Sequence, residues 1–382
     1  MPPGGDPFVD LPATGAWQRG DNPGRRRFVT LFNDEALALE LGGEIGPVEV
    51  AYETWGIPRP GNAVLVCHAL TGDSHLDGPA GPGHRSPGWW PGITGPGSAL
   101  DSNEWFVVCP NALGGCQGTT GPASLHADGR PWGPRFPQLT LRDQVAVEAA
   151  LADALGIEQW AAVVGGSLGG MRVLEWAVGY PDRLERAVVV ATTAAATAEQ
   201  IALSAIQSAA IRLDPGFSGG DYYSAAAGTG PARGLGVARR LGHLSYRSPQ
   251  ELTDRFDRAD QDGEHALTGG RYAIESYLDH QAVKLAQRFD ANSYLVLTRA
   301  MDHHDIGRGR GGIDAALGRV RAQVTVAGVD SDRLYPLEQQ ERLARALPGR
   351  EPVHVIRSPA GHDGFLIEAD QIDGLVAQAL AR

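Results

Sequence analysis

A serine between glycines is the residue whose setting most clearly predicts chemistry. The run from Val163 to Met171 reads V-V-G-G-S-L-G-G-M, which places Ser167 in a G-x-S-x-G pattern between an apolar run and a helix-like pattern. Small residues on both sides let a strand turn sharply into a helix and leave the hydroxyl exposed at the turn. With 51 glycines among 382 residues the pentapeptide alone is a weak signal, and its position between the two patterns makes Ser167 the predicted nucleophile.

A base and an acid follow the serine in a fitting order. A serine hydroxyl attacks at neutral pH only when a base, usually a histidine oriented by a carboxylate, removes its proton. The order Ser, then Asp or Glu, then His resembles that of α/β-hydrolases, with the acid after a late strand and the histidine after the last one. Asp332 and His362 occupy such places, after the apolar runs 323–328 and 353–356. Asp330 is the alternative acid, but the spacing from Asp332 to the next proline favours Asp332 and leaves Asp330 to shape the turn.

Acyl transfer also needs hydrogen-bond donors for the charge that develops on the carbonyl oxygen. The Leu168 amide follows the nucleophile directly, and the turn after the apolar run 63–67 offers the Leu70 amide as a second donor. No metal site is expected, because the three cysteines lack ligand spacing and the adjacent His303 and His304 are interpreted as a solvated helix end. The predicted chemistry is therefore nucleophilic catalysis without a metal.

Strand-like runs alternate with helical patterns in the first and last parts of the chain. The strand-like runs are 28–31, 48–53, 63–67, 105–109, 160–164, 187–191, 323–328 and 353–356, and the helical patterns are 141–155, 169–179, 338–347 and 365–381. This alternation predicts a mostly parallel central sheet flanked by helices, and the order of serine, aspartate and histidine after its strands resembles the α/β-hydrolase fold. Because ligand sites gather at the carboxyl ends of strands in such sheets, Ser167, Asp332 and His362 are expected to meet there.

The pattern changes between residues 196 and 312. Apolar residues there fall at helical spacing, breaks rich in glycine and alanine separate the segments, and no clear buried strand is present. We interpret 196–312 as a helical lid insertion that divides the hydrolase core into a first part, 1–195, and a second part, 313–382. Residues 1–26, rich in proline, glycine and aspartate, are expected to form a loose arm.

Composition excludes several classes of protein. Charged residues are 20% and hydrophobic residues 42%, which is typical of a globular protein. The formal net charge of −12 argues against non-specific binding to nucleic acid or to an anionic membrane. No apolar stretch approaches the roughly 18 residues of a membrane span, and the first residues lack the apolar core of a signal peptide. We therefore expect a soluble cytoplasmic protein with reduced cysteines.

Six stretches together resemble the homoserine O-acetyltransferase family, a branch of the α/β-hydrolases. They are CHALTG at 67–72, GWWPG at 88–92, NALGGCQG at 111–118, GGSLGGM at 165–171, GVDSDRLYP at 328–336 and GHDGF at 361–365. The resemblance implies transfer of an acyl group from acyl-CoA to the hydroxyl of L-homoserine, a step in methionine biosynthesis. It implies Ser167 as nucleophile, Asp332 as acid and His362 as base.

The family also holds its amino acid with an arginine and an aspartate. The segment 236–248 resembles the arginine motif and makes Arg239 the match, while Asp363 matches the aspartate and Tyr246 is a weaker candidate for the same pocket. Homoserine is a zwitterion, so its carboxylate suits a guanidinium and its ammonium suits a carboxylate. The alternatives are that Arg239 lies on a solvated helix face and that Asp363 caps a helix.

The resemblance further implies acetyl-CoA as co-substrate, no permanently bound cofactor, and a homodimer formed through the helical insertion. Three alternatives remain at this point. The donor could be succinyl-CoA, or the acceptor serine; the same three residues could act on water, as in an esterase; or the fold could be a binding protein on an inactive hydrolase scaffold. The intact order of serine, aspartate and histidine argues against the last alternative.

Overall fold

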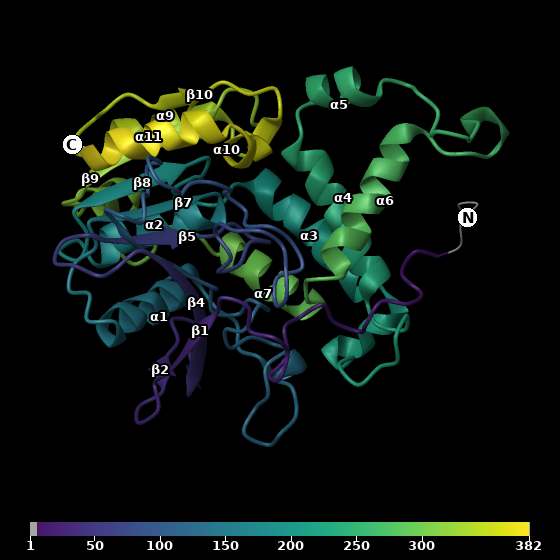
Figure 1. The fold of residues 1–382 in the computed structure, drawn as a ribbon, viewed down its shortest axis with the longest axis horizontal. Coiled ribbons are helices and arrows are strands. Elements are labelled where there is room, and N and C mark those ends of the chain that lie inside the picture. The colour runs from purple at the N-terminus through teal and green to yellow at the C-terminus, as the bar shows by residue number, and fades with distance from the viewer. Residues whose placement is uncertain (1–5, 382) are drawn as a thin grey trace.

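An eight-stranded sheet forms the centre of the protein, whose structure is a computed structural model that describes residues 6–381 (Figure 1). The strands lie in the order β1-β4-β6-β5-β7-β8-β9-β10. Their bounds are β1 (Arg27–Leu31), β4 (Val48–Trp55), β5 (Ala63–Cys67), β6 (Phe106–Pro110), β7 (Ala162–Gly166), β8 (Arg186–Val190), β9 (Gln323–Val329) and β10 (His354–Ile356). Strand β4 pairs antiparallel with β1 and β6, and the other neighbours pair in parallel, so the predicted mostly parallel sheet is confirmed.

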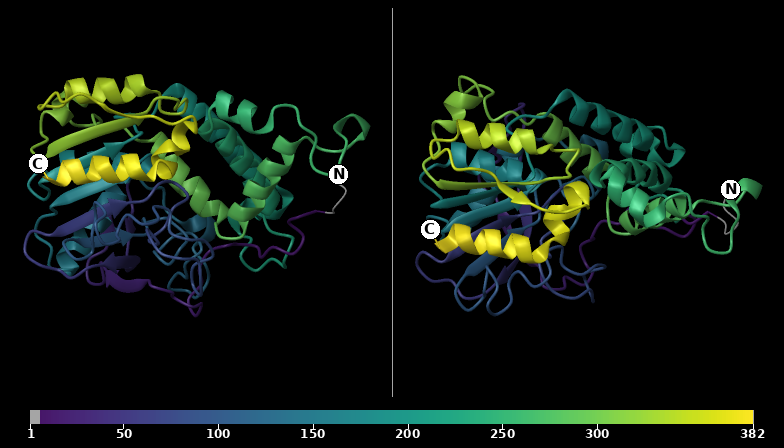
Figure 2. Two further views of the ribbon diagram at one scale, coloured as in Figure 1. Left: turned by 45° about the horizontal axis from the view of Figure 1, so that its top comes forward. Right: turned by 90° about the horizontal axis from the view of Figure 1, so that it is seen from above.

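Helices cover both faces of the sheet (Figure 2). These are α1 (Leu141–Ala154), α2 (Leu168–Gly179), α9 (Leu337–Ala346), α10 (Gly364–Ile367) and α11 (Ala369–Ala381). In β5, Leu65 and Cys67 pack into the core beneath α1, α2 and α9, whereas Val64 and Val66 pack into the opposite core beneath α11. A strand buried on both faces has a continuous apolar sequence, which is why the sequence pattern located the central strands.

Two details of the core differ from the expectation. The single helix predicted near 365–381 is wrong, because Glu368 has a ψ of 63° and separates α10 from α11. A small hairpin of β2 (Leu37–Ala38) and β3 (Glu44–Ile45) was not predicted. Strands of two residues are too short to show an alternating pattern, so the sequence carries no periodic signal for them.

The segment between β8 and β9 is helical and lies beside the carboxyl ends of the strands (Figures 1 and 2). Its elements are α3 (Ala198–Arg212), η2 (Pro215–Gly220), α4 (Ala232–Tyr246), α5 (Pro249–Phe256), η3 (Ala266–Thr268), α6 (Ala273–Ala286) and α7 (Ala291–Asp302), and α8 (Ile313–Leu317) follows. A β-bridge between Ala195 and Asp305 joins the two ends of this segment. No helix within residues 6–381 has both the length and the apolar character needed to cross a lipid bilayer.

The amino-terminal arm is packed between Phe8 and Ala16, so the expectation of a loose arm is wrong for this part, whereas residues 18–25 are exposed. Phe8 and Leu11 are buried in the core of the helical segment, together with side chains of α4 and α6. Gly236 of α4 leaves room for the Phe8 ring, since a Cβ there would lie 2.7 Å from that ring. The Thr14 hydroxyl donates to Asp290 at 2.8 Å. Residues 1–5, which belong to the predicted arm and to the first core part, and residue 382 lie outside the described residues.

Candidate active site

A strained turn presents Ser167 between β7 and α2. Its φ of 57° and ψ of −123° lie outside the regions that non-glycine residues usually adopt. The Ser167 amide donates to the Val190 carbonyl at 3.0 Å, and the Thr192 hydroxyl donates to the Ser167 carbonyl at 2.9 Å. Gly169 allows the start of α2 to approach β5, because a Cβ at this position would lie 2.0 Å from the Cys67 carbonyl oxygen. The turn is therefore fixed by hydrogen bonds on the β8 side and by close packing on the β5 side.

Ser167, His362 and Asp332 form a continuous chain of hydrogen bonds. The His362 Nε2 atom lies 3.0 Å from the Ser167 Oγ, and its Nδ1 lies 2.7 Å from an Asp332 carboxylate oxygen. Because a carboxylate only accepts, the imidazole proton belongs on Nδ1 and Nε2 is free to accept from the serine. The three residues are 5%, 4% and 6% exposed, so little water competes for these bonds. This arrangement suits proton transfer from a nucleophile to a base.

The two candidate acids have different surroundings. Two backbone amides, of Leu334 and Tyr335, donate to the Asp332 Oδ1 at 2.8 and 2.9 Å, which leaves the other oxygen for His362. Asp330 instead accepts from the Ser358 amide at 3.1 Å and faces the Arg357 guanidinium. The structure therefore brings Asp332 to the histidine and places Asp330 in the neighbouring turn.

Burial and neighbouring carboxylates have opposite effects on the pKa of His362. Burial of the imidazole acts to lower the pKa of His362, but the charge and the hydrogen bond of Asp332, together with the charge of Asp363, outweigh burial. The net result is a pKa of His362 above its ordinary value of 6.5. A raised pKa strengthens the imidazole as a base for the serine proton.

The two predicted oxyanion donors lie in the turn after β5 and at the start of α2, two segments that approach one another closely at Gly169. Leu70 follows β5 and lines the cavity that also contains Ser167, and Leu168 begins α2. No protein atom of residues 6–381 accepts a hydrogen bond from either amide. Within the described residues both amides are therefore free of an intramolecular acceptor, as a donor to a bound oxygen must be.

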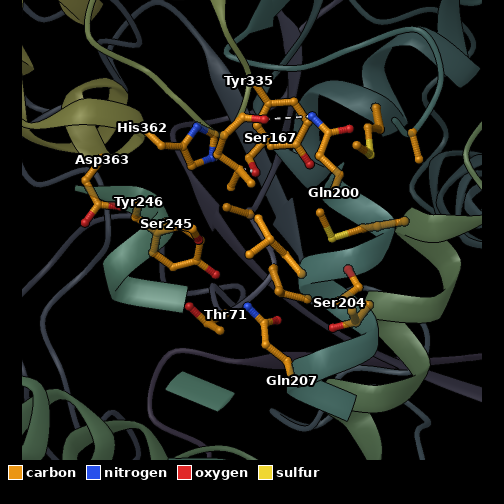
Figure 3. A pocket seen from close by; sticks show the side chains of 18 of the residues that line it. Thr71, Ser167, Gln200, Ser204, Gln207, Ser245, Tyr246, Tyr335, His362 and Asp363 are labelled. Carbon is orange, nitrogen blue, oxygen red and sulfur yellow. Dashed lines mark hydrogen bonds between the residues drawn. The ribbon is translucent and has the colours of Figure 1, made fainter. Parts of the chain in front are cut away.

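A cavity of about 140 Å³ opens beside the serine hydroxyl (Figure 3). Arg239 of α4 reaches it from the helical segment, and its Nη1 donates weakly to the Thr71 hydroxyl at 3.4 Å. The Arg239 Nε is buried without a partner in the described chain. Arg240, the next residue, is directed instead to Asp279 at 2.7 Å. Arg239 therefore lines the cavity and does not lie on a solvated face.

Asp363 and Tyr246 line the same cavity (Figure 3). The Asp363 carboxylate lies 3.2 Å from the Arg247 Nε, and its side chain makes no capping bond to α10. The centroid of the Tyr246 ring lies 5.8 Å from the Arg239 guanidinium and 5.9 Å from the centroid of the His362 ring. All three predicted substrate-binding residues thus meet at the cavity of Ser167.

Sequence reasoning missed Tyr335 and Gln200. The Tyr335 ring packs on the His362 imidazole with 5.0 Å between centroids, in addition to the bond from its amide to Asp332. The Gln200 side chain donates to the Leu334 carbonyl at 2.8 Å and so joins α3 to the acid loop (Figure 3). Tyr335 lies inside a recognised motif, which was an available signal. Gln200 has no comparable signal, because its partner is 134 residues away.

One group of buried side chains has the composition of a metal site. Within residues 6–381, ligand atoms of Glu53, His75 and His84 lie within 4.8 Å of one another. The two imidazoles are stacked at 3.8 Å with 12° between their planes, so their in-plane lone pairs run parallel and do not converge on one ion. Glu53 accepts from His75 at 3.0 Å, and we assign this group to structural hydrogen bonding.

The histidine pair at the end of α7 also differs from the expectation. His304 is buried at 4% exposure and its Nε2 lies 2.9 Å from the Thr193 carbonyl oxygen, so the prediction of a solvated helix end is wrong for this residue. Burial lowers the pKa of His304 to about 4, which keeps its imidazole neutral. His303, its neighbour, is only partly buried. Structural packing accounts for this pair.

Comparison with known proteins places this site in a family. The family described as the alpha/beta hydrolase fold matches residues 62–369. Homoserine O-acetyltransferase of Thermobifida fusca (strain YX) is 59% identical over 379 residues, which cover 99% of each chain. Among solved structures, homoserine O-acetyltransferase from Bacillus anthracis is 27% identical with a TM-score of 0.83, over 94% of this chain and 97% of that one. Esterase E22 is 25% identical with a TM-score of 0.82, over 93% and 99%.

Sequence identity decides the family, because the fold is shared with an esterase. More than half of the residues are identical to those of the Thermobifida fusca protein along nearly the whole of both chains. The predicted α/β-hydrolase fold is confirmed, and so is the resemblance carried by the glycine-rich and tryptophan-rich loops. This chain belongs to the homoserine O-acetyltransferase family, whose members are enzymes of the α/β-hydrolase fold.

Proposed function

We propose that this protein transfers an acetyl group from acetyl-CoA to the hydroxyl of L-homoserine through an acetyl-serine intermediate on Ser167. The observation that carries the proposal is the placement of a guanidinium and a carboxylate, from Arg239 and Asp363, in the cavity of a serine already bonded to a histidine. An esterase acting on simple esters has no need of such a charged pair. A zwitterionic acceptor such as homoserine does.

The first half-reaction forms the acetyl-enzyme. His362 Nε2 takes the Ser167 hydroxyl proton while the serine oxygen attacks the thioester carbon of acetyl-CoA. The carbonyl oxygen becomes negative and accepts hydrogen bonds from the Leu70 and Leu168 amides. The carbon–sulfur bond then breaks, the thiolate receives the proton from His362, and CoA leaves as a free thiol. Asp332 keeps the imidazole oriented and stabilises its charged form.

The second half-reaction transfers the acetyl group to homoserine. Arg239 binds the carboxylate of the amino acid and Asp363 binds its ammonium, which directs the hydroxyl toward His362. His362 accepts the hydroxyl proton as the oxygen attacks the acetyl carbon. The bond from that carbon to the serine oxygen then breaks, and His362 returns the proton to Ser167. Acetyl-CoA is therefore a co-substrate, and no permanently bound cofactor takes part.

We assign residues 196–312 as a lid and 1–195 with 313–382 as the hydrolase core. The lid walls support transfer over hydrolysis, because an acetyl-enzyme that is open to solvent would react with water. We further propose that the lid forms a homodimer interface, since large apolar side chains of Ile206, Leu213 and Val237 are exposed on it. A biosynthetic enzyme of this kind is assigned to the cytoplasm, with small molecules as its substrates.

Thiol release in the presence of each substrate tests the function. Purified protein is mixed with acetyl-CoA, with and without L-homoserine, and free CoA is followed while the products are identified by mass spectrometry. We expect release that depends on homoserine, together with O-acetylhomoserine and a transient acetyl group on Ser167. Succinyl-CoA and L-serine serve as the matched donor and acceptor controls. Release that homoserine does not accelerate, or the same rate with water alone, contradicts the proposal.

A further inference from the structure

A fully buried histidine lies behind the turn that carries the Leu70 amide. His68 has 0% exposed surface, and its Nε2 accepts from the Ala112 amide at 2.9 Å. A neutral imidazole has one nitrogen that accepts and one that donates, so the proton must be on Nδ1. Nδ1 lies 2.7 Å from the Ala69 carbonyl oxygen and therefore donates to it.

The surroundings keep this imidazole in one protonation state. Burial, with the positive charge of Arg172 as the next contribution, lowers the pKa of His68 to about 3. The ring is therefore neutral near pH 7. Its two hydrogen bonds have fixed directions, one donated and one accepted, and proton transfer by His362 does not change them.

The Ala69 carbonyl and the Leu70 N–H belong to one planar peptide group. In a trans peptide the two bonds point in opposite directions, so a bond that fixes the carbonyl also fixes the direction of the N–H. The carbonyl accepts from His68 at 2.7 Å and from the Gly72 amide at 2.9 Å, and the Leu70 residue that carries the N–H lines the cavity of Ser167. Donation to a carbonyl also polarises its peptide and strengthens the N–H as a donor.

The same turn is attached to the helix that starts at the nucleophile. The Arg172 guanidinium of α2 donates to the His68 carbonyl at 2.6 Å and to the buried Glu148 carboxylate at 2.5 Å. Trp176, one turn further along α2, donates to the other Glu148 oxygen at 2.7 Å. The Leu70 turn is thus tied to α2, which begins with the other proposed donor, Leu168.

We propose that His68 is a positioning residue for the oxyanion hole, which aims the Leu70 amide at the carbonyl oxygen of the acyl group through its bond to the Ala69 carbonyl. The inference rests on the proposed function, because it requires acyl transfer at Ser167. It assigns a role in the rate of acyl transfer to a side chain that does not touch the substrate.

Two substitutions separate the two hydrogen bonds of the ring. The amide nitrogen of Asn occupies the position of Nδ1, so His68→Asn keeps the donor to the Ala69 carbonyl and leaves the Ala112 amide without an acceptor. The amide oxygen of Gln reaches the position of Nε2, so His68→Gln keeps the bond from Ala112 and loses the donor to Ala69. An unpaired buried amide is costly, so His68→Asn is the less stable of the two.

Acylation of Ser167 is measured under single-turnover conditions with acetyl-CoA and, in parallel, with p-nitrophenyl acetate, alongside thermal unfolding. We expect His68→Gln to lower the acylation rate constant about 10-fold or more while leaving the KM for the donor within about 3-fold, as for a weakened oxyanion donor. His68→Asn should retain a rate constant within about 3-fold of the unsubstituted enzyme despite its lower melting temperature. Rate and stability then change in opposite order, which a purely structural role would not produce.

A third variant covers the case in which either substitution prevents folding. Gly72→Ala retains the imidazole but displaces it, since the new Cβ would lie 2.9 Å from the His68 Cβ. It too should lower the acylation rate constant at nearly constant KM. The inference is overturned if acylation in His68→Gln or Gly72→Ala equals that of the unsubstituted enzyme, or if the rates follow the melting temperatures. Acylation by p-nitrophenyl acetate but not by acetyl-CoA would refute the proposed function alone and leave this test intact.

Discussion

The two walls of the cavity are built in different ways. On the sheet side, Ser167, Asp332 and His362 are almost fully buried and are fixed by short bonds to one another and to backbone groups. On the helical side, Arg239 donates weakly to the Thr71 hydroxyl at 3.4 Å, and the Arg239 Nε and the Thr298 hydroxyl are buried without hydrogen-bond partners in the described chain. On the sheet side the catalytic side chains already have their hydrogen-bond partners, whereas on the helical side some buried polar atoms have none.

This difference indicates that the sheet side carries out acyl transfer and the helical side binds the amino acid. Preorganised groups accelerate a reaction because they need not rearrange in the transition state. Buried polar atoms without partners are unfavourable in the empty protein, and a ligand that supplies the partners regains that free energy. We therefore expect substitutions on the sheet side to reduce the rate of both half-reactions, and substitutions on the helical side to weaken use of the amino acid.

Ser167→Ala should have the largest effect on the sheet side. Loss of the nucleophile removes the acetyl-enzyme and lowers kcat by roughly 10⁴-fold or more. Alanine at the same strained turn loses the bond to His362 but leaves no buried charge unpaired, so the free energy of unfolding should change by less than about 1 kcal/mol. Mass spectrometry after incubation with acetyl-CoA and thermal unfolding measure both effects. Ser204→Ala, on the opposite wall, is the control; an acetylated Ser167→Ala protein would contradict the assignment.

Asp332→Asn should lower kcat by about 10⁴-fold, because the asparagine amide turns the imidazole to the wrong tautomer. It should also move the pH profile. His362 acts as a base when neutral, and Asp332 raises its pKa, so activity in the unsubstituted enzyme falls as pH drops through this raised value. Removal of the carboxylate lowers that pKa, and the acid limb of residual activity shifts to lower pH. Asp330→Asn is the matched control, and an unchanged pH profile in Asp332→Asn would count against the assignment.

Arg239→Ala is the corresponding change on the helical side. It should raise the KM for homoserine by about 10- to 100-fold, which corresponds to loss of a charge-assisted hydrogen bond. Formation of the acetyl-enzyme should remain within about 3-fold. Arg240→Ala is a matched control, because Arg240 pairs with Asp279 at a partly exposed site where ion pairs contribute little. Equal losses in both half-reactions would remove the distinction between the walls.

Tyr246→Phe should have the smallest effect. The ring beside Arg239 and His362 remains, and only its hydroxyl is lost, so the KM for homoserine should rise by about 3-fold with little change in kcat. Tyr277→Phe, whose hydroxyl contacts His243 away from the cavity, is the control. A large loss of acetyl-enzyme formation in Tyr246→Phe would show that the Tyr246 hydroxyl acts in acyl transfer and not in binding homoserine.

The sequence predicted the sheet side in more detail than the helical side. A buried strand and the turn that follows it are local patterns, so the positions of Ser167, Asp332 and His362 after their strands could be predicted from short runs. On the helical side, Arg239 was identified only through a family motif, since Arg239 and Arg240 are adjacent and periodicity does not distinguish them.

Contacts between distant segments explain what was missed. Burial of Phe8 depends on the absence of a side chain at Gly236, and the role of Gln200 depends on a carbonyl 134 residues away. His75 and His84 lie in a loop without helix or strand, where their rings stack on one another and His75 contacts Glu53. None of these pairings produces a periodic pattern, because each partner is selected by the finished fold.

The position of the helical segment in the topology has a wider consequence. Strands β8 and β9 are paired neighbours, although the whole segment separates them in the chain, and the bridge from Ala195 to Asp305 closes its base. A segment that leaves the sheet and returns to it at neighbouring strands can change in length or in sequence at small entropic cost. Such a change does not shift the register of the strands. Replacement of this helical segment would therefore change the preference for the acceptor, while Ser167, Asp332 and His362 keep their positions on the sheet.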